Sequence, residues 1–116
     1  MPQQAEASTL LVLTTLPDGE TARTMLRMLL ERHLVACGTV LEGVTSVYRW
    51  EGTIEEAREV QVLLKTSSGR WEALRDAVEE LHPYDVPELL ALPVTTGLPA
   101  YLAWVGRETQ LEGKSG

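Results

Sequence analysis

The chain lacks several features that define specialised classes of protein. Among its 116 residues are one cysteine, no phenylalanine, and only 10 lysines and arginines against 17 aspartates and glutamates, a formal net charge of −7. A single cysteine cannot form an intramolecular disulfide, which excludes a disulfide-stapled secreted module. No run of five or more basic residues occurs. We therefore expect no nucleic-acid partner, because binding to phosphates requires a basic surface.

Long apolar runs are also missing. The longest one near the N-terminus covers residues 10–13, too short for a signal peptide or a membrane span. The 44% hydrophobic and 23% charged fractions are typical of a soluble globular protein, and the length fits one domain. We expect frayed ends at residues 1–7 and 111–116, a single domain at residues 8–110, a cytoplasmic location and no membrane partner.

Turn residues and apolar spacing divide the first half of the chain. Residues 8–15 are apolar and β-branched and predict a central strand. Asp18 is expected to cap a helix that runs to about residue 34, with His33 in its last turn. Residues 35–50 predict a long strand with an interruption at Gly43. The Glu51-Gly52 turn then joins it to a partner strand at residues 53–66.

The second half repeats this alternation. An apolar stripe predicts a helix over residues 71–81, which His82-Pro83 ends. Residues 88–95 predict a fourth strand, and Pro93 favours an edge position or a bulge. Pro99 opens a C-terminal helix to about residue 109. The order β-α-β-β-α-β plus a C-terminal helix predicts an α+β ferredoxin-like sandwich, with helices on one face of a four-stranded antiparallel sheet.

The other face of this sheet is left open. Strand alternation places a mixed set of side chains there: Glu59, Gln61, Leu63 and Lys65. In a monomer, this face would simply meet water. The aromatic residues Tyr48 and Trp50 lie close to the hairpin tip, however, and exposed aromatic side chains favour burial against another subunit.

Few residues are candidates for chemistry. Cys37 is either a small buried hydrophobe or a metal-ligating thiolate, and a catalytic role is weakest because no adjacent base accompanies it. His82 either neutralises a helix dipole or binds a metal. No second His or Cys lies three to five residues from either, so a metal site must be assembled from distant strands or across subunits. Glu59 and Lys65 are expected to form structural salt bridges across neighbouring strands or subunits, with anion binding by Lys65 as the alternative.

Several motifs occur in a characteristic order. They are Leu34-Val35-Ala36-Cys37, Ser46-Val47-Tyr48-Arg49-Trp50-Glu51-Gly52, Glu59, Lys65-Thr66, His82-Pro83-Tyr84-Asp85-Val86-Pro87-Glu88 and Tyr101-Leu102-Ala103-Trp104. In this order and spacing, from about residue 10 to residue 107, the chain resembles CutA, the divalent-cation tolerance protein family. The pieces S-x-Y-x-W-x-G and H-P-Y-x-x-P-E are highly specific in combination.

The resemblance implies a homotrimer whose open sheet faces pack around a threefold axis, similar in architecture to the PII signal-transduction proteins. It implies tolerance to divalent cations, with copper or another divalent cation as ligand, and no enzymatic activity. Cys37 and His82 are the copper-related residues that it implies. The residues matching the inter-subunit cleft are Tyr48, Trp50, Glu59, Lys65, Tyr84, Glu88 and Trp104.

Two departures from the family pattern reduce the number of potential metal ligands. Thr14 stands where some members of the family carry a cysteine, and Leu81 stands where some carry a second histidine. One thiolate and one imidazole make a weak site for Cu(II), and the soft thiolate suits Cu(I) better. The alternatives to a copper-binding protein are a PII-like module that binds a small effector between subunits and a trimeric scaffold for a partner protein.

Overall fold

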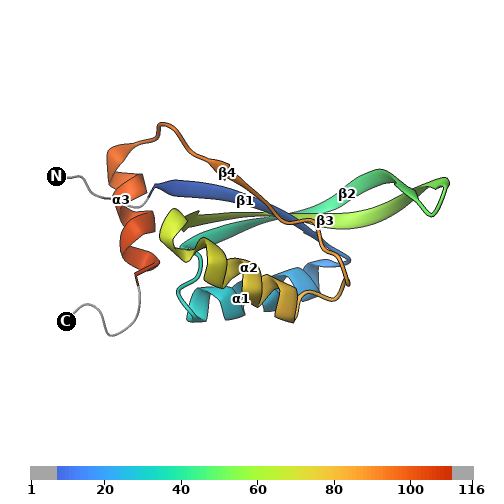
Figure 1. The fold of residues 1–116 in the computed structure, drawn as a ribbon, viewed down its shortest axis with the longest axis horizontal. Coiled ribbons are helices and arrows are strands. Elements are labelled where there is room, and N and C mark those ends of the chain that lie inside the picture. The colour runs from blue at the N-terminus through green and yellow to red at the C-terminus, as the bar shows by residue number, and fades with distance from the viewer. Residues whose placement is uncertain (1–7, 111–116) are drawn as a thin grey trace.

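The strands and helices follow the expected order in a computed structural model, which describes residues 8–110 (Figure 1). The ends expected to fray, 1–7 and 111–116, lie outside these described residues. Four strands pair antiparallel in the order β2-β3-β1-β4. Their bounds are β1 Thr9–Leu16, β2 Cys37–Trp50, β3 Thr53–Ser67 and β4 Leu90–Pro93. The predicted α+β fold is confirmed.

Two α-helices cover one face of the sheet, α1 (Gly19–Glu31) and α2 (Trp71–Leu81), the latter after a short 3₁₀ turn at Ser68–Arg70. A third, α3 (Pro99–Glu108), lies at one end of the sheet (Figure 1). The Asp18 carboxylate accepts the Thr21 N–H at 2.7 Å, so the predicted N-cap is confirmed. Pro99 opens α3 as predicted.

His33 does not lie in the last turn of α1, because that helix already ends at Glu31. The chain turns there, with His33 at a φ of +59°. Its Nδ1 lies 3.1 Å from the Glu108 carbonyl oxygen, a contact that links the end of α1 to the end of α3.

The hydrophobic core lies between the sheet and the helices α1 and α2. Alternate residues of β1 and β3 point into it, and they meet the apolar stripes of both helices. Its fully buried large side chains include Val12, Leu16, Leu29, Val62, Leu64, Leu74 and Val78. The inner face of the sheet is thereby buried, and Cys37, Glu59 and Lys65 lie on the opposite, open face.

The β2–β3 hairpin is much longer than the sheet needs. Its register shifts between Leu41 and Val44, where Gly43 has a φ of +75° that favours glycine. Glu51 and Gly52 both have positive φ at the tip, as a tight type I′ hairpin turn requires. Residues 44–58, called the arm below, project beyond the helices (Figure 1).

The open face carries more apolar surface than β3 alone predicted. The pairing register places leucines from all four strands on it, called the leucine patch below: Leu11, Leu13, Leu41, Leu63, Leu90 and Leu92. Leu90 is 55% exposed. The strand β4 covers four residues instead of the predicted 88–95, but its predicted edge position is confirmed.

Candidate functional site: two clusters at opposite ends of the open face

The candidate residues fall into two clusters along β3. Glu59 belongs to one and Lys65 to the other, and six residues of extended strand separate them by roughly 20 Å. Within the described part of one chain, neither takes part in an ion pair. Each instead binds an uncharged hydroxyl, so neither forms the expected salt bridge to a neighbouring strand within the described residues of one subunit.

The histidine cluster consists of His82, Tyr84, Glu59 and the Thr15 carbonyl. His82 caps the C-terminal end of α2 and is only 7% exposed. Its Nε2 lies 2.7 Å from the Thr15 carbonyl oxygen, and its Nδ1 accepts the Tyr84 N–H at 3.1 Å. A carbonyl accepts and an N–H donates, so the ring carries its proton on Nε2 and is neutral.

Electrostatics agree with a neutral ring. Burial lowers the pKa of His82 below its ordinary 6.5, although the Thr15 carbonyl and Glu59 oppose the shift. The ring binds a strand carbonyl and carries no charge, so the interpretation of His82 as a neutraliser of the helix dipole is wrong.

Tyr84 extends the histidine cluster towards the arm. Its ring contacts the imidazole of His82, with centroids 4.9 Å apart, and its hydroxyl donates to Glu59 Oε2 at 2.8 Å. Burial and the bond to Glu59 raise the pKa of Tyr84 to about 12. Tyr48 adds to this rise. Three predicted cleft residues, Tyr48, Glu59 and Tyr84, therefore lie near one another.

The thiol cluster occupies the end of the sheet next to α3. Cys37 lies directly opposite Lys65 in the register, and its Sγ shares a 3.3 Å hydrogen bond with the Tyr101 hydroxyl. That bond and burial raise the pKa of Tyr101 to about 12. Lys65 donates to Thr39 Oγ1 at 3.2 Å. The Tyr101 ring lies against Trp104, with centroids 5.6 Å apart.

Residues 8–110 of one subunit contain no complete copper site. Cys37 belongs to one cluster and His82 to the other, and both nitrogens of His82 are already engaged. Within residues 8–110, no group of three or more His, Cys, Asp or Glu side chains is placed to hold a metal. Thr14 points into the core, away from Cys37, and its hydroxyl has no partner there among the described residues. A ligand at position 14 would therefore be on the wrong side of the sheet.

Two predicted cleft residues lie outside both clusters. Trp50 is 57% exposed near the tip of the arm, and Glu88 is exposed between α2 and β4. Two hydrogen-bond partners of the site residues were not predicted from the sequence: Thr39, which accepts from Lys65, and the Thr15 carbonyl, which accepts from His82. Strand parity with Cys37 could have identified Thr39, but no sequence signal marks the Thr15 backbone carbonyl as the acceptor for His82.

Comparisons with a family model, with curated relatives and with solved structures all match the chain to the same family. The family model described as CutA1 divalent ion tolerance protein matches residues 10–108. The divalent-cation tolerance protein CutA of Thermus thermophilus is 43% identical over 98 residues, 84% of this chain and 95% of the relative. That of Salmonella newport is 48% identical over 94 residues, 81% of this chain and 82% of the relative. The crystal structure of divalent ion tolerance protein CutA1 from Ehrlichia chaffeensis superposes with a TM-score of 0.87 at 31% identity, covering 92% of this chain and all of the other.

Proposed function

Because the chain belongs to the CutA1 divalent ion tolerance family, we propose that it acts in the response to divalent cations as a cytoplasmic homotrimer without catalysis of its own. The leucine patch on the open face is the observation that carries this proposal. Leu41, Leu90 and Leu92 are each more than two-fifths exposed in the single subunit. Apolar patches of this kind mark surfaces that a partner covers.

Assembly around an axis would cover this face. A threefold arrangement buries the same surface of every copy and closes without a free end. The described residues contain no helix long and apolar enough to cross a membrane.

Sedimentation equilibrium tests the assembly directly. The wild-type protein is expected at three times the mass of one chain, and Leu90→Asp is expected to dissociate it because the charge falls within the buried patch. Leu30→Asp is the matched control, since Leu30 is 37% exposed on α1, on the helical side of the molecule. A wild-type protein that sediments as a monomer contradicts the proposal.

We also propose that copper is bound at Cys37 and not at His82. The only cysteine of the chain supplies the only thiolate, the ligand type that Cu(I) prefers. It lies half-buried on the open face, so a second subunit can supply the ligands that one subunit lacks. His82 would have to break two hydrogen bonds to bind a metal.

Anaerobic titration with Cu(I), followed by calorimetry, separates these two residues. Cys37→Ser is expected to abolish saturable binding. Wild-type protein should give the same nitrogen chemical shifts for His82 with and without copper. Loss of the Nε2-protonated state on adding copper contradicts the assignment, and no saturable binding by wild-type protein removes copper from the proposal while leaving the trimer.

A small anionic effector is the second candidate ligand, and Lys65 favours it. Its ammonium group has no carboxylate within ion-pair distance in the described part of the chain, in a protein of net charge −7. Thermal unfolding with ATP, citrate or inorganic phosphate tests it. An anion at 100 times its Kd is expected to stabilise the protein by about 2.7 kcal/mol, and Lys65→Ala should remove this shift. No shift with any of the three contradicts effector binding for these anions.

A further inference from the structure

The base of the arm is a break in the ladder between β2 and β3. The pairing register skips there, so that Glu42 and Gly43 of β2 lie opposite the single residue Val60 of β3. A bulge of this kind leaves its extra residue outside the ladder and bends the strand. Gly43 has a φ of +75°, which glycine adopts at the least steric cost. Backbone pairing alone therefore fixes the angle between the arm and the body only weakly.

The Glu42 side chain ties the bulge to α1. Its Oε2 accepts from Arg23 Nη1 at 2.7 Å. The same oxygen lies against the first residue of the helix, since a Cβ placed on Gly19 would come within 2.5 Å of it. Gly19 thus leaves room for a carboxylate at the N-terminus of α1, where the helix dipole stabilises a negative charge.

The other strand of the base has a tie of a different kind. Glu59, which pairs with the first residue of the arm, accepts the Tyr84 hydroxyl at 2.8 Å. This tie leads to the segment after α2, and its donor is uncharged. Arg23 and Glu42, in contrast, are 55% and 57% exposed and both charged. Dissolved salt should therefore weaken the Glu42 tie much more than the Glu59 tie.

We propose that Glu42 and Gly43 form a hinge for the arm, and that the Glu42 carboxylate is a salt-sensitive latch that sets its angle by binding Arg23 and the N-terminus of α1. All of these contacts lie within one chain, so the inference does not depend on the proposed homotrimer. The arm projects beyond the helices (Figure 1). Its strand 44–50 is about 23 Å long, so a rotation of about 10° at the hinge moves the tip by about 4 Å. The latch thus determines where the tip and the exposed Trp50 are presented.

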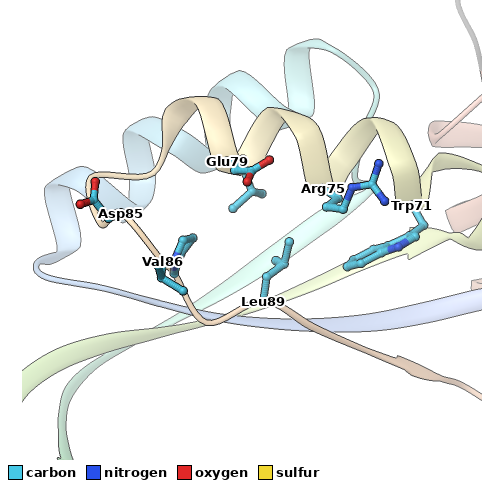
Figure 2. Close-up of a pocket in the computed structure, with 8 residues that line it drawn as sticks. Trp71, Arg75, Glu79, Asp85, Val86 and Leu89 are labelled. Carbon is cyan, nitrogen blue, oxygen red and sulfur yellow. The ribbon is translucent and has the colours of Figure 1, made fainter. Parts of the chain in front are cut away.

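Hydrogen exchange of the arm amides, followed by mass spectrometry at low ionic strength, tests the latch. Glu42→Gln and Arg23→Gln should each speed exchange in residues 44–58 by about threefold, as expected for an ion pair of this exposure, and leave β1 unchanged. Glu79→Gln is the matched control. Glu79 is an exposed acid beside the pocket on α2 (Figure 2), and no described residue forms an ion pair with it. Arm exchange in Glu42→Gln that equals wild type, or that rises by the same factor in β1, overturns the latch.

A glycine substitution separates the position of the carboxylate from its charge. Gly19→Ala keeps both Glu42 and Arg23 but places a methyl group where the carboxylate now lies. We expect the arm to exchange about as fast as in Glu42→Gln. Gly69→Ala is the control, because a Cβ there meets nothing within 4 Å. An arm that exchanges in Gly19→Ala as slowly as in wild type contradicts the proposed seat on α1.

Ionic strength provides a third measurement. Between about 0.01 M and 1 M NaCl the screening length falls from about 30 Å to about 3 Å, so exchange of the wild-type arm should rise towards that of Glu42→Gln. The Glu42→Gln arm itself should change little. Tyr84→Phe removes the uncharged tie and should speed exchange by the same factor at both salt concentrations. An equal response to salt in wild type and Glu42→Gln overturns the ionic latch.

Discussion

The histidine cluster and the thiol cluster differ in how far their reactive side chains are buried and hydrogen-bonded. At one end His82 is 7% exposed and both its nitrogens are paired with backbone groups. At the other end Cys37 is half-buried and shares one weak sulfur hydrogen bond with Tyr101, which is 40% exposed. Histidine and cysteine look equally fit for metal binding in the sequence. Their hydrogen bonds distinguish them. Both ring nitrogens of His82 already bind backbone groups, whereas the Cys37 thiol has only one weak partner and can bind a ligand.

The largest loss of stability should come from removing the His82 side chain. His82→Ala leaves the Thr15 carbonyl and the Tyr84 N–H without partners in a poorly hydrated place, and each orphaned group costs roughly 1–3 kcal/mol. We expect the free energy of unfolding in urea to fall by about 3 kcal/mol, measured at one protein concentration because assembly shifts apparent stability.

His33→Ala is the matched control for this loss. His33 makes a single ring contact, with the Glu108 carbonyl, near the surface, so its removal should cost no more than about 1 kcal/mol. Equal losses for the two histidines would mean that His82 is not a special support of the fold.

A smaller difference should separate the two tyrosines. Tyr84 donates to a carboxylate at 2.8 Å, whereas Tyr101 bonds a thiol at 3.3 Å, and sulfur is a weak partner. Tyr84→Phe should cost about 1.5 kcal/mol and Tyr101→Phe about 0.5 kcal/mol. Urea unfolding of both variants checks this order, and a larger loss for Tyr101→Phe would reverse the comparison.

The fold followed from the sequence because its signals are local. Asp18, the Glu51-Gly52 turn and Pro99 each fix an element boundary through their own backbone chemistry. The short extent of β4 could not be read in the same way, because residues 88 and 89 are as compatible with a strand as residues 90–93. Only the length of the pairing with β1 decides where that strand begins.

The site was harder to predict because it depends on which residues meet. The alternation of side chains along β3 correctly placed Glu59 and Lys65 on one face. Alternation does not show which residues come into contact, and these two belong to different clusters. The partner of His82 is a backbone carbonyl, which leaves no trace in residue identity. The leucine patch needed the register of three strand pairs before its leucines could be recognised as neighbours.

Mild acid should weaken the histidine cluster with the smallest effect, because protonation leaves every side chain in place and removes only the hydrogen bond at Nδ1. The pKa of His82 is lowered below 6.5 by burial. As the pH falls below about 6.5, the unfolded chain binds a proton at this position before the folded chain does, so stability decreases. The loss is complete once the pH has passed below the folded pKa. A ¹⁵N titration should show that His82 is neutral and protonated on Nε2 at pH 7 and takes up its proton only below the ordinary pKa of 6.5. The free energy of unfolding should decline as the pH falls below 6.5. A His82 ring that is charged at pH 7 would contradict both the tautomer and the contrast between the two ends, because a cation at Nδ1 cannot accept the Tyr84 N–H.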